Sequence, residues 1–122
     1  MLFFFCLMQR KSIFASRSDK RILDMAKILL VEDEVNIASF IERGLKEFGH
    51  TVKVCHDGNC GWKQLQEEPF DLLIFDIIMP KINGLELCHL YRKRYGYQTP
   101  VIMLTALGTT EDIVKGLDAG AD

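Results

Sequence analysis

Residues 71–84 read D-L-L-I-F-D-I-I-M-P-K-I-N-G. The apolar run at 72–75 shows no polar alternation, which is typical of a strand buried on both faces of a parallel sheet. An acid, Asp76, ends this run. Proline, asparagine and glycine follow within a few residues and predict a loop, after which a helix is expected over about 85–95.

Three more strands are predicted around this one. Two are continuous apolar runs, at 27–31 and 101–104, and they are expected to be buried on both faces. The other, at 51–55, alternates between apolar and polar residues. This alternation favours an edge position with one face in contact with water.

Helices are predicted between the strands and after the last one, because apolar residues recur there at helical spacing. The apolar positions are Ile37, Phe40, Ile41, Leu45 and Phe48 in the first helix, Trp62 and Leu65 in the second, and Cys88, Tyr91 and Tyr95 in the third. The fourth helix is expected to begin at Thr109 or Thr110. Alternating strands and helices predict an α/β fold, an open parallel sheet with helices on both faces.

The composition fits one globular domain. The chain has 122 residues, of which 48% are hydrophobic and 26% are charged, and no apolar run approaches the roughly 20 residues of a membrane-spanning helix. Residues 25–122 carry ten basic and fifteen acidic side chains, a net charge of −5. A nucleic-acid backbone is therefore an unfavourable partner for this part, and cations are favoured.

Residues 1–24 differ from the rest. They open with eight apolar residues followed by five basic ones among 10–21, the reverse of the order in a signal peptide. We expect an N-terminal extension that is disordered or comes from a start codon assigned too far upstream, with the domain beginning near Met25. A short membrane-surface anchor is the alternative.

The cysteines are Cys6, Cys55, Cys60 and Cys88. They form no C-x-x-C pair and no zinc-binding spacing. We expect reduced thiols in a cytoplasmic protein, each serving as a small buried hydrophobic side chain.

Polar side chains follow three of the apolar strands at their carboxyl ends. Glu32 and Asp33 follow 27–31, Asp76 ends the strand at 72–75, and Thr105 follows 101–104. In open α/β sheets ligands bind at this end of the strands. If the three strands are neighbours, the carboxylates converge, and an all-oxygen site of this kind suits Mg²⁺.

Each of these residues also has an ordinary structural interpretation. Glu32 and Asp33 fit a solvated helix start, with Asp33 as its N-cap. Asp76 fits a turn residue, and Thr105 fits a strand or cap residue. A metal site is nevertheless favoured, because folding alone does not require an acid or a hydroxyl at the same end of three apolar strands.

Four motifs resemble the receiver domain of bacterial two-component response regulators. They are K-I-L-L-V-E-D-E at 27–34, D-L-L-I-F-D-I-I-M-P-K-I-N-G at 71–84, P-V-I-M-L-T-A at 100–106 and G-L-D-A-G-A-D at 116–122. The resemblance covers 25–122 and implies a flavodoxin-like, doubly wound sheet with strand order 2-1-3-4.

The resemblance also implies a role for each site residue. Asp76 would accept a phosphoryl group from a sensor histidine kinase. Asp33, Asp76 and the main-chain carbonyl of Ile78 would hold Mg²⁺, and Glu32 would act through a metal-bound water. Thr105 would be the switch hydroxyl. A receiver of this kind takes part in a phosphorelay and is not itself expected to be an enzyme.

The family pattern continues past residue 122 with a fifth strand, a lysine at its end and a fifth helix. We therefore expect 25–122 to be an incomplete receiver within a longer protein. The resemblance favours a cytoplasmic, DNA-binding transcription regulator of the winged-helix class, with DNA bound only through a further output domain. A receiver homodimer is possible in that protein. The alternative is a degenerate receiver that acts only as a protein-interaction module.

Overall fold

The computed structural model describes residues 26–104. The predictions for the extension at 1–24, for Thr105 and for the fourth helix concern residues outside this range. None of the helices within 26–104 is long and apolar enough to cross a membrane.

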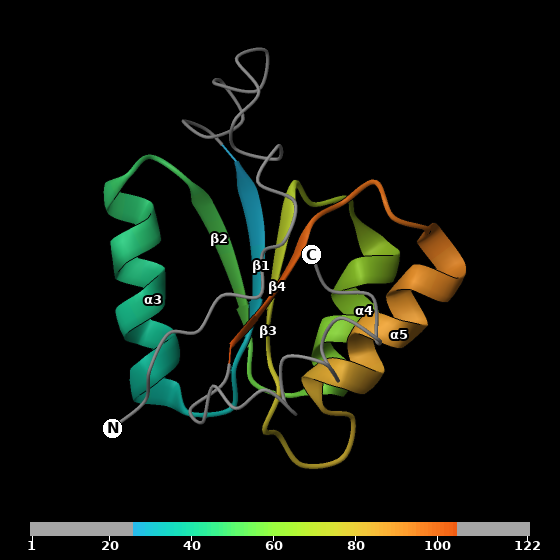
Figure 1. The fold of residues 1–122 in the computed structure, drawn as a ribbon. Helices are drawn as coiled ribbons and strands as arrows, with labels where there is room; N and C mark the ends of the chain where they lie inside the picture. The colour runs from blue at the N-terminus through green and yellow to red at the C-terminus, as the bar shows by residue number, and fades with distance from the viewer. Residues whose placement is uncertain (1–25, 105–122) are drawn as a thin grey trace.

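The described strands form one parallel sheet with the order β2-β1-β3-β4 (Figure 1). The strands are β1 (Lys27–Val31), β2 (Thr51–Cys55), β3 (Leu72–Asp76) and β4 (Val101–Leu104). The predicted order 2-1-3-4 is confirmed. Strand β2 pairs only with β1 among the described residues, and its alternating burial confirms the predicted edge position.

Helices cover both faces of the sheet. They are α3 (Val35–Glu47), α4 (Gly58–Glu67) and α5 (Gly84–Tyr95). Figure 1 shows α3 on one side of the sheet and α4 and α5 together on the other. This arrangement is that of a doubly wound α/β fold.

Alternate residues of each strand enter two separate hydrophobic clusters. Leu29, Phe75 and Met103 face α4 and α5, whereas Leu30, Ile74 and Ile102 face α3. Both sides of the central strands are buried, which explains why their sequences show no polar alternation.

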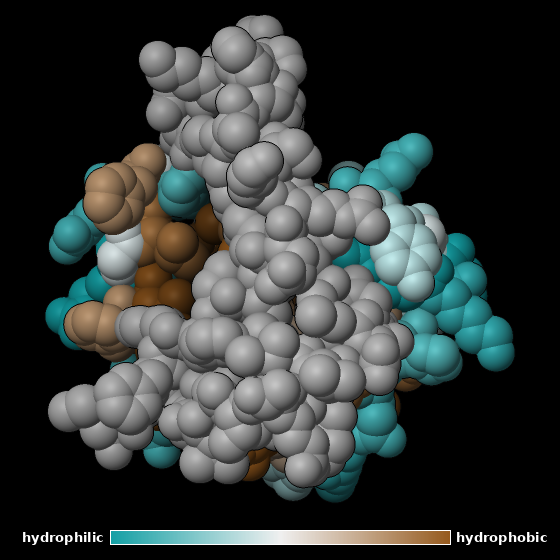
Figure 2. Space-filling view, in the orientation of Figure 1, coloured by the Kyte–Doolittle hydropathy of each residue, from teal (hydrophilic) through white to brown (hydrophobic). Residues whose placement is uncertain are grey.

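Part of the predicted helical pattern is wrong. Phe40 and Phe48 are 60% and 77% exposed, and Tyr95 is 41% exposed. Phe48 follows the last residue of α3 as its C-cap, so it no longer obeys the helical repeat. Figure 2 shows hydrophobic surface on the side of the molecule where α3 lies.

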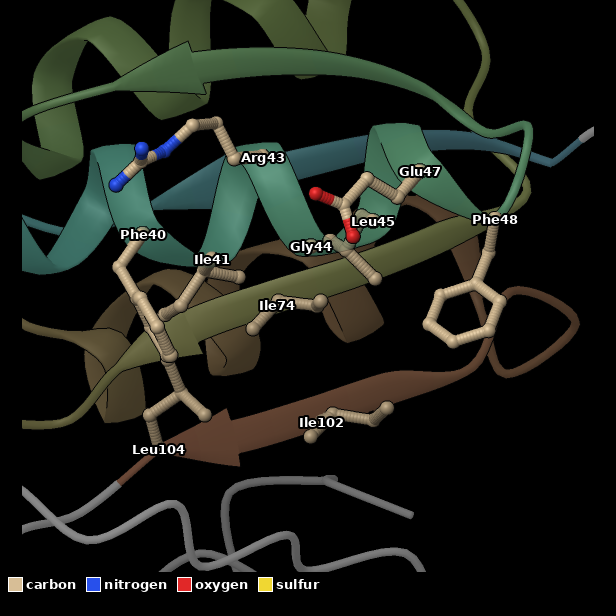
Figure 3. Close-up of a pocket in the computed structure, with 10 residues that line it drawn as sticks. All are labelled: Phe40, Ile41, Arg43, Gly44, Leu45, Glu47, Phe48, Ile74, Ile102 and Leu104. Carbon is tan, nitrogen blue, oxygen red and sulfur yellow. The ribbon is translucent and has the colours of Figure 1, made fainter.

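Among the described residues, an apolar groove of about 650 Å³ runs between α3 and the strands β3 and β4. Ile41 of α3, Ile74 of β3 and Ile102 of β4 line its floor and wall (Figure 3). The exposed Phe48 also borders this groove, at the end of α3.

The prediction of reduced thiols is wrong for Cys55 and Cys60, which form a disulfide. Cys55 ends β2 and Cys60 lies in the first turn of α4, and the turn between those elements brings their Cα atoms to 5.7 Å. Cys88 is fully buried as predicted, and Cys6 lies outside the described residues.

Candidate metal centre

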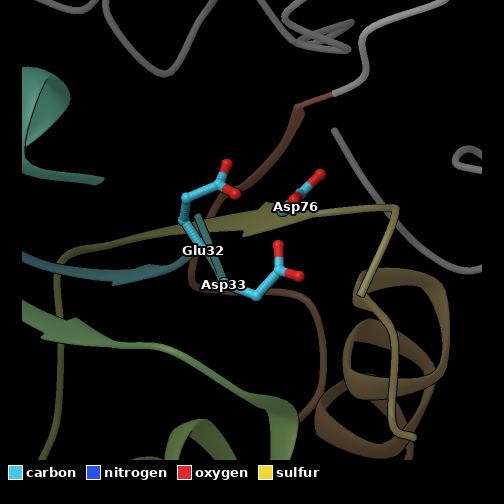
Figure 4. A group of neighbouring side chains, drawn as sticks. All are labelled: Glu32, Asp33 and Asp76. Carbon is cyan, nitrogen blue, oxygen red and sulfur yellow. The ribbon is translucent and has the colours of Figure 1, made fainter. Parts of the chain in front are cut away.

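Three acidic side chains meet at the carboxyl ends of β1 and β3. Carboxylate oxygens of Glu32, Asp33 and Asp76 lie within 4.8 Å of one another, and Figure 4 shows the three groups pointing toward a common space. The register of the sheet causes this meeting, because Val31 pairs with Phe75 directly before the acids. The predicted convergence of Glu32, Asp33 and Asp76 is therefore confirmed.

Burial differs among the three carboxylates. Glu32 and Asp76 are 1% and 5% exposed, whereas Asp33 lies at the surface. Main-chain N–H groups fix the buried pair: that of Glu34 donates to Oε2 of Glu32 and that of Ile78 donates to Oδ1 of Asp76, both at 3.1 Å. The site therefore has a rigid buried half and an open side at Asp33.

Burial raises the pKa of Glu32 from 4.5 to about 8, and its contact with the Asp76 carboxyl adds to this shift. Burial also raises the pKa of Asp76, although the contact with Glu32 and the Ile78 N–H opposes the shift. Without a cation, a protonated Glu32 can donate a hydrogen bond to Asp76. A bound divalent cation would remove the need for that proton.

The N-cap alternative for Asp33 is not what the structure shows. The side chain of Glu34 caps α3, with its Oε1 accepting the N–H of Asn36 at 3.0 Å. Asp33 thus extends from the turn between β1 and α3 toward the other two acids.

Residues 28–122 match the model of the response regulator receiver domain. The chain belongs to this family. It is 46% identical over 98 residues to the response regulator ArlR of Staphylococcus epidermidis, a match that covers 80% of the chain but 44% of ArlR. The chain thus spans less than half the length of this relative.

Solved receiver structures share the fold. The Francisella response regulator 1452 receiver domain is 34% identical with a TM-score of 0.75, covering 80% of this chain and 79% of that one. The response regulator TrrA of Thermotoga maritima, solved in complex with Mg²⁺-BeF, is 33% identical with a TM-score of 0.59, covering 62% and 64%.

The structure adds two residues to the surroundings of this receiver site. The carbonyl oxygen of Cys55 accepts the N–H of Glu32 at 2.9 Å, and Nδ1 of His56 lies 2.9 Å from the carbonyl oxygen of Glu32. Sequence reasoning missed both. The only signal that could have found them is the position of Cys55 at the end of the strand next to β1.

Proposed function

We propose that this receiver domain accepts a phosphoryl group on Asp76 with the help of Mg²⁺. The observation that carries the proposal is the meeting of Glu32, Asp33 and Asp76 within 4.8 Å at the carboxyl edge of a parallel sheet. Receiver-family membership supports the same assignment.

The donor set fits a magnesium ion. The side-chain ligands found within residues 26–104 are carboxylate oxygens, which Mg²⁺ prefers to nitrogen or sulfur. Oε1 of Glu32 is buried and accepts no hydrogen bond from the described residues. Such an oxygen needs a proton, a water molecule or a cation beside it. We assign the metal to Asp33, Asp76 and the carbonyl oxygen of Ile78, with Glu32 acting through a metal-bound water.

Asp76 would act as the nucleophile. A carboxylate oxygen attacks phosphorus in line, and the bond from phosphorus to the leaving nitrogen or oxygen of the donor breaks with its electron pair. The N–H of Ile78 holds the carboxylate during this step. The bound metal would neutralise charge on the transferred group. Thr105 would then donate its hydroxyl to a phosphoryl oxygen as the switch residue.

The donor we propose is a sensor histidine kinase, and small acyl phosphates are a simpler substitute. In the whole protein, phosphorylation would bias a two-state receiver that controls a DNA-binding output. A receiver homodimer is the proposed route to that output.

Transfer from acetyl phosphate tests the assignment. The chain is incubated with this donor and Mg²⁺, and the intact mass is measured. We expect a gain of one phosphoryl group, and no gain in Asp76→Asn or when the metal is chelated.

Asp57→Asn is the matched control. Asp57 is a further aspartate at the same edge, in addition to Asp33 and Asp76, and its side chain caps α4 by accepting the N–H of Cys60 at 2.7 Å. Asparagine can also cap a helix, so this variant should still be phosphorylated. A mass gain in Asp76→Asn would contradict the assignment. No gain in the wild-type chain would favour a protein-interaction module.

A further inference from the structure

Cys55 and Cys60 lie beside the acidic site without belonging to it. Cys55 is the last residue of β2 and is 2% exposed, whereas Cys60 lies in the first turn of α4 and is half-buried. Their Cα separation of 5.7 Å falls in the range that natural disulfides occupy. The fold therefore holds the two residues at bonding distance, and Cys60 is the more accessible of the two.

The short segment between these cysteines contacts both loops of the acidic site. On one side, Cys55 and His56 contact the main chain of Glu32, each at 2.9 Å. On the other side, a Cβ atom at position 58 would lie 2.3 Å from the carbonyl oxygen of Ile82. The backbone of Gly58 therefore lies directly against the loop that follows Asp76, and a constraint on this segment reaches both loops.

We propose that Cys55 and Cys60 are a reversible thiol-oxidation site, and that closing the disulfide restrains the main chain of Glu32. Disulfides in cytoplasmic proteins, where they occur, are usually transient or redox-sensing rather than structural. Because the pair spans only the turn between β2 and α4, opening it frees this turn while the paired strands of the sheet remain in place.

The oxidant is the disulfide form of a low-molecular-weight thiol. The more exposed Cys60 loses its proton and attacks the disulfide, which forms a mixed disulfide and releases one thiol. Cys55 then loses its proton, attacks the sulfur of Cys60 and releases the second thiol. Two protein thiols are oxidised by two electrons, and the small disulfide is reduced to two thiols.

Trypsin produces one fragment that reports on this pair. Cleavage after Lys53 and after Lys63 releases residues 54–63, which contain both Cys55 and Cys60 but no other cysteine. The whole chain is equilibrated with glutathione at rising ratios of disulfide to thiol, quenched in acid, alkylated after unfolding and digested. We expect the doubly alkylated fragment to give way to an unlabelled fragment, whose mass is that of the unalkylated dithiol fragment less two hydrogen atoms. The fragment carrying Cys88 is the internal control and should take one label throughout.

Hydrogen exchange tests the link to the acidic site. The amide of Glu32 should exchange about threefold to tenfold more slowly in the oxidised chain than in the reduced chain. Both forms have the wild-type sequence, so no substitution can disturb folding. Neither measurement involves phosphate, so the inference and the proposed phosphorylation of Asp76 can fail separately.

Three results would overturn the inference. The first is a fragment that keeps two labels at every glutathione ratio. The second is a stable glutathione adduct on Cys60 with Cys55 still reduced. The third is an equal exchange rate at Glu32 in the oxidised and reduced chains.

Discussion

The first turn of α5 lies against the main chain of the proposed phosphoacceptor: a Cβ atom at position 84 would fall 2.2 Å from the carbonyl oxygen of Asp76. Position 84 therefore requires glycine, because any side chain there would overlap the main chain of Asp76. The loop after β3 therefore returns to the end of that strand at the point where α5 begins.

Gly84→Ala should destabilise the domain by about 2 to 4 kcal/mol, because the new methyl group overlaps a main-chain atom that cannot rotate away. Urea unfolding measures the change. Gly44→Ala is the control: nothing lies within 4 Å of a Cβ at that exposed helical position, so alanine should stabilise the chain by about 0.5 to 1 kcal/mol. Equal effects of the two substitutions would show that the contact with Asp76 is unimportant.

The raised pKa of Glu32 predicts how stability changes with pH in metal-free protein. Between the ordinary pKa of 4.5 and the folded value of about 8, the folded state binds more protons than the unfolded state. Stability is therefore highest at the acidic end of this window and falls as the pH rises through it. We expect a loss of about 2 to 4 kcal/mol in chelator, measured by urea unfolding at a series of pH values.

Glu32→Gln should remove most of this pH dependence because glutamine carries no titrating proton. Added Mg²⁺ should stabilise the wild-type chain more at high pH than at low pH, since the metal replaces the proton. A wild-type chain that becomes more stable as the pH rises through the same window would contradict the assignment.

The capping box of α5 predicts the effect of Asn83. Its Oδ1 accepts the N–H of Glu86 at 2.9 Å, and the Glu86 side chain accepts the N–H of Asn83 at 3.1 Å. Asn83→Ala should cost about 1 kcal/mol, whereas Asn83→Asp should keep most of the stability. Thermal unfolding followed by circular dichroism compares the two, and a loss of equal size in both would exclude capping as the cause.

Reduction of the Cys55–Cys60 disulfide should also cost stability. The bond closes a loop of six residues, for which the loss of chain entropy in the unfolded state gives about 2 kcal/mol. The midpoint of urea unfolding should therefore fall when a phosphine reductant is added. Cys60→Ser should show no response to the reductant, and a response of wild-type size in that variant would contradict the explanation.

Local patterns in the sequence predicted most of the fold and much of the site. The apolar runs that became β1, β3 and β4 have no alternation because both of their faces are buried. The acids that follow β1 and end β3 converge because parallel strands all end at one edge of the sheet. The edge position of β2 was predicted because polar residues alternate with apolar ones along this strand, which indicates one face in contact with water.

Contacts between distant residues could not be predicted in this way. Glu32 and Asp33 are adjacent in the sequence and both acidic, yet one is buried and the other exposed. Neither the pairing of Cys55 with Cys60 nor the exposure of Phe48 follows from hydrophobic spacing, because both depend on how the chain turns at the end of an element.

The spacing of apolar and acidic residues was thus sufficient for the parallel sheet and for the identity of the carboxylates at its edge, whereas the strand order came from the resemblance to receiver domains. The sheet follows from the burial of its strands on both faces, which the continuous apolar runs indicate, and from the right-handed connections between parallel strands. The tertiary structure was needed for the raised pKa of Glu32 and for the contact of Cys55 with its main chain. The pKa is raised because packing around the carboxylate of Glu32 excludes water. The contact exists because β2 pairs with β1, which brings the end of one strand beside the end of the other.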